Sequence, residues 1–127
     1  MLDIEFQNAA GDAALRLTFD STGVFRAKTG YRSKNMLKYT ANQLYHITIK
    51  LNTDTRFYTV NVNGKDVLTN LFFAPVLNVE RVVFRTGDVR RFPNANTPTD
   101  QDYDQPNAGE PVAPATFYIK SFKTTVY

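Results

Sequence analysis

Apolar and polar residues alternate along most of the chain, which is the pattern of β-strands that bury one face. Leu15, Leu17 and Phe19 form the first clear example, separated by Arg16 and Thr18. No window of about 11 or more residues repeats with the period of a helix, so helix is expected only as short turns. Strand patterns follow at residues 25–30, 45–51, 58–62, 65–68, 79–86 and 116–124.

Short turn motifs separate these segments. The residues Asp20-Ser21-Thr22-Gly23 predict a turn between the first two strands. Asn63-Gly64 is the strongest local signal, because a two-residue type I′ hairpin needs positive φ at both central positions. Residues 65–68 should therefore fold back on residues 58–62.

Residues 93–114 have a different composition. They hold five of the six prolines, four acids and no base. A loop of this length inside a domain is uncommon and usually has a function or is mobile. Because only one strand pattern follows it, the segment is predicted to be a long acidic, proline-rich loop within one domain rather than a linker.

The strand count and spacing predict the fold class. About eight or nine short strands linked by turns indicate an all-β, antiparallel two-sheet sandwich or jelly roll formed by a single domain, residues 1–127, with a closed barrel as the main rival. The predicted inner faces consist of Leu15, Leu17, Phe19, Ile47, Ile49, Val60, Val62, Val82, Phe84, Phe117 and Ile119.

Composition excludes several functional classes. The absence of cysteine rules out disulfides, thiolate zinc sites and cysteine nucleophiles. His46, the single histidine, leaves no second imidazole for a metal site, and its alternation places it outward. The longest apolar stretch, residues 71–77, is far too short to span a bilayer, so no membrane insertion is expected.

One pair of strands resembles a known family. Residues 45–52, Tyr-His-Ile-Thr-Ile-Lys-Leu-Asn, and residues 58–65, Tyr-Thr-Val-Asn-Val-Asn-Gly-Lys, resemble the central hairpin of laminin-G-like and concanavalin A-like jelly rolls. The resemblance covers residues 15–90, and the tail from Val82 to Phe122 is also similar to accessory domains attached to secreted, Bacteroidetes-type polysaccharide-degrading enzymes. The resemblance implies a concanavalin A-like fold, an extracytoplasmic location, and a catalytic domain elsewhere in a longer chain from which this one is excised. The first residues, 1–7, lack a signal-peptide pattern, which fits an excised piece.

Catalysis is not expected. A retaining glycosidase needs two carboxyl groups about 5 to 5.5 Å apart, which alternate positions on a strand can supply. The acids in strand-like segments are scattered: Asp20, Asp54, Asp66, Glu80 and Asp88. A small glycoside hydrolase or lyase stays open only if the fold brings two acids together in a cleft.

Alternating aspartates in the long loop are candidate metal ligands. Asp100, Asp102 and Asp104, with Asn107 and Glu110 nearby, could supply several of the oxygen ligands that Ca²⁺ prefers. The run lacks the spacing of an EF-hand, and a solvated surface loop has the same composition. Calcium is therefore the candidate cofactor.

Basic and aromatic residues form the third candidate site. Alternation places Arg16, Arg26 and Lys28 away from the core, so neighbouring strands could present arginines to uronate carboxylates and tyrosines to sugar rings. A solvated charged face is the alternative interpretation. Nucleic acid is not an expected partner, because the net charge is only +3 and no recognition helix or RNA-binding motif is present. The predicted glycan-binding residues are Arg26, Lys28, Tyr31, Arg32, Arg85 and Arg90.

The sequence thus predicts a non-catalytic carbohydrate-binding or accessory module of a larger secreted glycan-degrading protein, with polysaccharide or oligosaccharide as partner and a preference for acidic polysaccharide. The alternative is a spacer that packs on a neighbouring catalytic domain through Phe57, Phe72 and Phe73.

Overall fold

The computed structural model describes residues 1–86, 92–100 and 114–126. Within them the chain forms eight strands and no helix, so no helix there could cross a membrane. In chain order the strands are β1 (Leu2–Gln7), β2 (Ala13–Phe19), β3 (Val24–Thr29), β4 (Arg32–Lys38), β5 (Ile47–Asn52), β6 (Phe57–Val62), β7 (Lys65–Leu71) and β8 (Arg81–Thr86).

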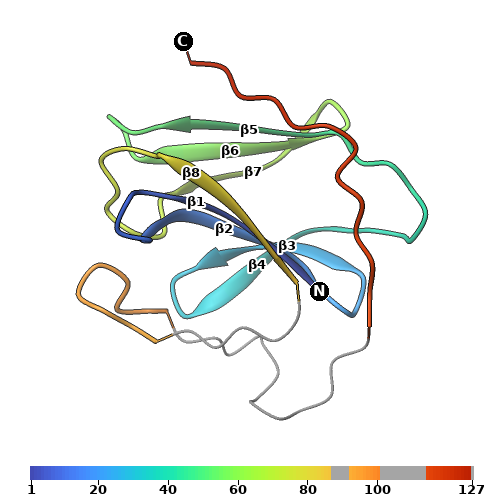
Figure 1. Cartoon of the computed structure of the whole chain (residues 1–127), viewed down its shortest axis with the longest axis horizontal. Coiled ribbons are helices and arrows are strands. Elements are labelled where there is room, and N and C mark those ends of the chain that lie inside the picture. Colours follow the sequence, from blue (N-terminus) through green and yellow to red (C-terminus); the bar gives the residue numbers. More distant parts are fainter. Residues whose placement is uncertain (87–91, 101–113, 127) are drawn as a thin grey trace.

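The strands form two antiparallel sheets that face each other (Figure 1). The larger sheet has the order β4-β3-β2-β1-β8, and the smaller has the order β5-β6-β7. β8 comes from late in the chain and pairs with β1, so the first strand lies inside the larger sheet. The all-β, two-sheet sandwich predicted from the alternation is confirmed.

The core lies between the two sheets. Phe25 is fully buried and stacks on Phe19 with ring centroids 4.1 Å apart, while Tyr58 and Val60 of the smaller sheet pack against the same cluster. Tyr58 is 1% exposed. Most of the predicted inner-face residues are in this cluster, either buried or partly buried: Leu15, Leu17, Phe19, Ile47, Ile49, Val60, Val62, Val82 and Phe117.

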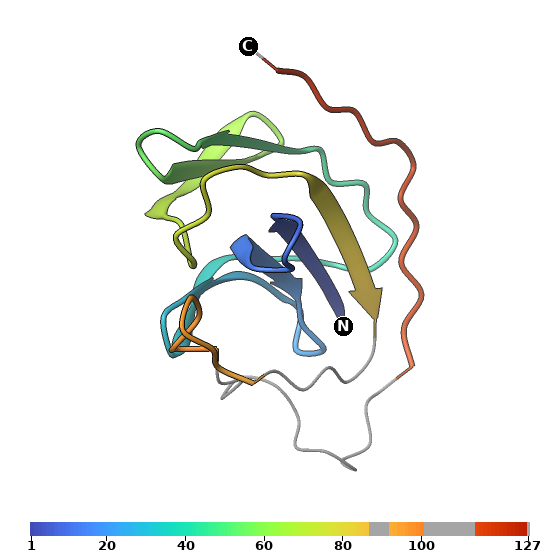
Figure 2. The same ribbon diagram turned by 60° about the vertical axis from the view of Figure 1, so that its left-hand side comes forward.

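Two predicted core residues are not buried. Phe84 lies opposite Ile4 on the inward side of β8, yet it is 37% exposed because β8 is the edge of the sheet. Ile119 is 50% exposed. The prediction of a strand at 116–124 is also wrong, because residues 114–126 run extended along the outside of the sandwich and join neither sheet (Figures 1 and 2).

Hydrophobic contacts hold this C-terminal segment against the sandwich. The ring centroids of Phe117 and Phe19 lie 6.4 Å apart. Phe122 packs edge to face against Phe84, with ring centroids 5.9 Å apart. The apolar pattern of the segment therefore reflects packing of single aromatic side chains and not a paired strand.

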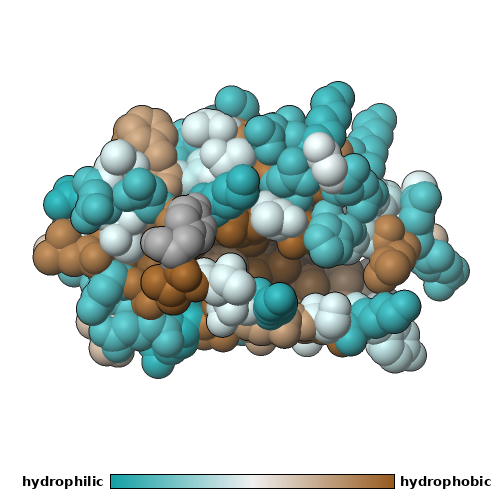
Figure 3. Space-filling view, turned by 90° about the horizontal axis from the view of Figure 1, so that it is seen from above, coloured by the Kyte–Doolittle hydropathy of each residue, from teal (hydrophilic) through white to brown (hydrophobic). Residues whose placement is uncertain are grey.

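Seen from above, mostly hydrophilic side chains surround a hollow in which hydrophobic atoms are visible (Figure 3).

The predicted turns form as expected. Asn63 and Gly64 have φ of 52° and 88°, the left-handed values that a type I′ turn requires, and they join β6 to β7. At the β2–β3 turn the Asp20 carboxylate accepts from the backbone N–H groups of Thr22 and Val24, both at 2.9 Å. The Tyr39 hydroxyl donates to the Asp20 carbonyl and ties this turn to the end of β4.

Candidate functional site

The outer face of the larger sheet carries a row of polar residues that crosses all five strands. Pairing places Arg85 of β8 opposite Asp3 of β1, Asp3 opposite Thr18 of β2, Thr18 opposite Arg26 of β3, and Arg26 opposite Asn35 of β4. Directly paired residues share a sheet face. The fold thus brings Arg26 and Arg85, two predicted glycan-binding residues, onto one face.

This face is much less exposed than the alternation predicted. Arg16 is 3% exposed and Lys28 is 5% exposed, although both lie on the face away from the core. Arg26 forms an ion pair with Asp20 at 3.3 Å, and its side chain is 15% exposed. The expectation of a solvated basic surface is therefore wrong for these three residues.

β1 accounts for much of this difference. Its pattern of Leu2, Ile4 and Phe6 with Asp3 and Glu5 was not recognised as a strand in the sequence, and it adds carboxylates to the predicted basic face. Buried charges are normally found in pairs, because an unpaired charge loses its hydration without compensation. The carboxylates of β1 therefore allow basic side chains on this face to be buried.

Arg16 is the centre of the charged cluster. Its Nη1 lies 2.8 Å from Asp100 Oδ1, and its Nε lies 3.7 Å from Glu5 Oε2. The other Glu5 oxygen lies 3.7 Å from Arg85 Nη1. The Phe73 ring also packs against Arg16, with the guanidinium carbon 5.2 Å from the ring centroid. Arg16 thus ties residues 92–100 and the chain after β7 to the sheet.

Two acids share one face of β1 at alternate positions, a pairing that sequence reasoning missed. Asp3 and Glu5 are each about 1% exposed. Thr18 donates to Asp3 at 2.6 Å, and Gln7 donates to Glu5 at 3.3 Å. These contacts bury the carboxylates beneath other side chains, so the pair does not form the open cleft that a glycosidase would need.

The predicted metal ligands are only partly described. Asp100 is buried with its carboxylate on Arg16, whereas Asp102 and Asp104 lie outside the described residues. Among the residues that are described, no group of three or more His, Asp or Glu side chains could hold a metal ion. The calcium site stays a prediction. Arg90 and Asp88 also lie outside the described residues.

The exposed part of the predicted glycan site lies at the β3–β4 turn. Tyr31 is 49% exposed and Arg32 is exposed. Lys28 Nζ donates to the Tyr31 carbonyl at 3.2 Å, and the Thr29 hydroxyl donates to the Arg32 carbonyl at 3.3 Å. Both bonds run from side chains at the end of β3 to carbonyl groups after Gly30, and they brace the turn. His46 is exposed, as its alternation predicted.

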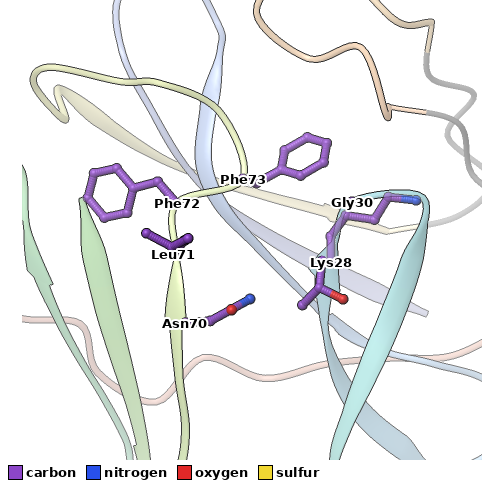
Figure 4. A pocket seen from close by; sticks show the side chains of 7 residues that line it. Lys28, Gly30, Asn70, Leu71, Phe72 and Phe73 are labelled. Carbon is purple, nitrogen blue, oxygen red and sulfur yellow. The ribbon is translucent and has the colours of Figure 1, made fainter. Parts of the chain in front are cut away.

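A pocket of about 280 Å³ lies beside this turn (Figure 4). One wall is the β3–β4 turn and the other is the end of β7 with the residues that follow it, so the two walls come from different sheets. Sequence reasoning missed this pocket because no local pattern relates its two walls. The lining residues are Lys28, Thr29, Gly30, Asn70, Leu71, Phe72 and Phe73.

Two buried or half-buried phenols have altered acidity. Burial raises the pKa of Tyr58 above its ordinary value of 10.0, and the Asn70 side chain, opposite Tyr58 in the β6–β7 pair, opposes the increase. Burial also raises the pKa of Tyr39, with a smaller contribution from the negative charge of Asp20. Both hydroxyls are therefore neutral near pH 7.

Comparisons with known proteins give the family. Residues 1–101 match the family model described as sialidase-like, CBM (carbohydrate-binding module) domain. None of the curated proteins matches the chain. A solved structure titled "Sialidase" is 45% identical with a TM-score of 0.68, and the match covers 85% of this chain and 10% of that one.

The chain spans about a tenth of the sialidase that it resembles. The family description names a carbohydrate-binding module and not a catalytic domain, in agreement with the expected non-catalytic role. The laminin-G-like and concanavalin A-like assignment stays a prediction beyond the shared all-β sandwich. Since the family model covers most of the chain, this protein belongs to the sialidase-like carbohydrate-binding module domain family.

Proposed function

We propose that this domain binds carbohydrate as a non-catalytic module of a longer, extracytoplasmic, sialidase-like protein. The family match and the partial match to a sialidase support this assignment. The observation that carries it is the exposed, braced β3–β4 turn, which presents Tyr31 and Arg32 next to a pocket.

The proposed ligand is an acidic glycan. Arg32 is exposed at the β3–β4 turn. Arg85 contacts Glu5 and lies on β8, at the opposite edge of the larger sheet, so it is not part of the site at this turn. A guanidinium can pair with a carboxylate through two parallel hydrogen bonds, and a tyrosine ring offers an apolar surface to a sugar. Lys28 stabilises the turn, since its ammonium donates a hydrogen bond to the Tyr31 carbonyl.

Affinity electrophoresis tests the function. The domain should migrate more slowly in gels that contain an acidic polysaccharide, such as a polyuronate, than in gels with a neutral glucan. Arg32→Ala and Tyr31→Ala should weaken the retardation, whereas Lys50→Ala, which removes an exposed cation from β5, should not. Equal mobility with and without every glycan tested would contradict carbohydrate binding.

A second candidate function is packing against a neighbouring catalytic domain. Phe57 and Leu71 lie opposite each other in the β6–β7 pair and are 46% and 55% exposed, which makes an exposed apolar pair. Phe73, also predicted for this role, is instead engaged with Arg16. If this candidate is correct, replacing Phe57 and Leu71 by serine in the longer protein should increase the rate at which limited proteolysis releases the domain. An unchanged rate of release would contradict it.

A further inference from the structure

We propose that the pocket between the β3–β4 turn and the end of β7 holds one pyranose ring at the end of a glycan chain. This inference rests on the proposed carbohydrate-binding function and assigns it a position and a mode. No residue of the pocket other than Lys28 was expected from the sequence to bind glycan.

Both walls of the pocket are fixed by hydrogen bonds. On one side, Lys28 and Thr29 bond carbonyl groups across the turn. On the other side, the Phe72 N–H donates to the Arg56 carbonyl at 2.8 Å, and the Phe73 N–H donates to the Ala14 carbonyl at 2.6 Å. A site whose walls are already in place loses less ordering entropy when a ligand binds.

The volume sets the size of the ligand. Sites for drug-sized molecules usually measure roughly 300–1,000 Å³, so a pocket of about 280 Å³ suits one sugar ring rather than several. Leu71, at 55% exposed, stands at the rim, so the pocket opens to solvent. A glycan chain could therefore enter by its end and leave across the exposed Tyr31 and Arg32.

The chemistry of the lining matches a pyranose. Asn70 and Thr29 offer an amide and a hydroxyl from opposite walls, and Leu71, Phe72 and Phe73 make up the apolar part of the lining. The Asn70 side chain points from β7 toward the wall that carries Lys28 (Figure 4). A sugar ring has hydroxyl groups around its edge and C–H groups on its faces, so it needs both kinds of contact. Ligand pockets in general combine an apolar surface with a few placed polar groups.

Gly30 is the lining residue at which a side chain can be added to the pocket wall without a clash. Its φ is +75°, and a Cβ added there would meet no heavy atom within 4 Å. Asparagine tolerates left-handed backbone better than most residues, so Gly30→Asn should fold and place a side chain at the pocket wall. Gly64→Asn is the matched control, because Gly64 has φ of +88° and equally open surroundings in the β6–β7 turn.

The experiment measures binding of methyl glycosides of hexoses and hexuronic acids by NMR and calorimetry, alongside a trisaccharide and the polymer. We expect the amide signals of Thr29, Gly30 and Asn70 to shift, and Gly30→Asn to lower the affinity at least about tenfold while Gly64→Asn leaves it unchanged. Glycan binding that persists in Gly30→Asn, or that shifts signals elsewhere only, would overturn the pocket but leave the proposed function in place. Absence of binding to every glycan would overturn both.

Discussion

Arg16 and Asp100 are separated by 84 positions in the sequence, yet their Nη1 and Oδ1 atoms lie 2.8 Å apart. The pair joins β2 to a segment that follows the last strand. Asp100 is the first residue of the run that the sequence predicts as a metal site. In the structure its carboxylate forms an ion pair with the Arg16 guanidinium.

The first prediction concerns the stability that this pair contributes. Arg16→Met should lower the free energy of unfolding by about 3–5 kcal/mol, because it leaves the buried carboxylates of Glu5 and Asp100 without this cation. Urea denaturation measures the change. Lys50→Met is the control, since Lys50 is exposed on β5, and it should change stability by less than about 0.5 kcal/mol. A loss for Arg16→Met as small as the control would show that the cluster is not structurally important.

Removing the cap of the β2–β3 turn should also destabilise the domain. Asp20→Ala takes away an acceptor for two backbone N–H groups and the ion partner of Arg26, at a cost of about 1–3 kcal/mol. Asp54→Ala, in the exposed β5–β6 turn, serves as the comparison and should cost much less. Thermal melts of both variants check the difference, and equal losses would contradict the role of Asp20.

Stability should decrease at alkaline pH. Tyr58 and Tyr39 have pKa values raised above 10.0 in the native state, so above about pH 10 the unfolded chain releases protons that the native state still holds. The stabilisation that comes from this difference in pKa is fully present below pH 10.0, and it is lost as pH increases through the native pKa values. Tyr58→Phe should reduce the slope of unfolding free energy against pH in this range. Tyr118→Phe, at a position 91% exposed, should leave the slope unchanged, and an unchanged slope in Tyr58→Phe would refute the assignment.

The calcium prediction is tested by melting temperature in calcium and in chelator. A site that uses Asp102 and Asp104 with Asp100 should raise the melting temperature in calcium, because a ligand that binds only the folded state stabilises it. Asp102→Asn should abolish the increase. An unchanged melting temperature at saturating calcium would contradict the site and leave Arg16 as the partner of Asp100.

The sequence predicted the sandwich well because local patterns determine its strands and turns. Asn63-Gly64 alone specified the β6–β7 hairpin. The alternation also assigned Arg16 and Lys28 to the correct face. It could not predict the burial of Arg16, since the ion partners of Arg16, Glu5 of β1 and Asp100, are distant in the chain.

The candidate site was predictable only in part, for a related reason. Tyr31 and Arg32 follow directly after the strand pattern at residues 25–30, and both are exposed as a binding surface requires. The pocket beside them needs Asn70 from the other sheet, and the packing of the two sheets is a tertiary property. One signal was available: Leu2, Ile4 and Phe6 alternate with polar residues and would have revealed β1.

Affinity electrophoresis against a polyuronate and a neutral glucan tests the central claim most directly. The account predicts that the native domain is retarded more strongly by the polyuronate, and that Arg32→Ala reduces this retardation while Lys50→Ala does not. Mobility that is identical in all gels, or retardation that Arg32→Ala and Lys50→Ala reduce equally, would contradict a carbohydrate site at the β3–β4 turn.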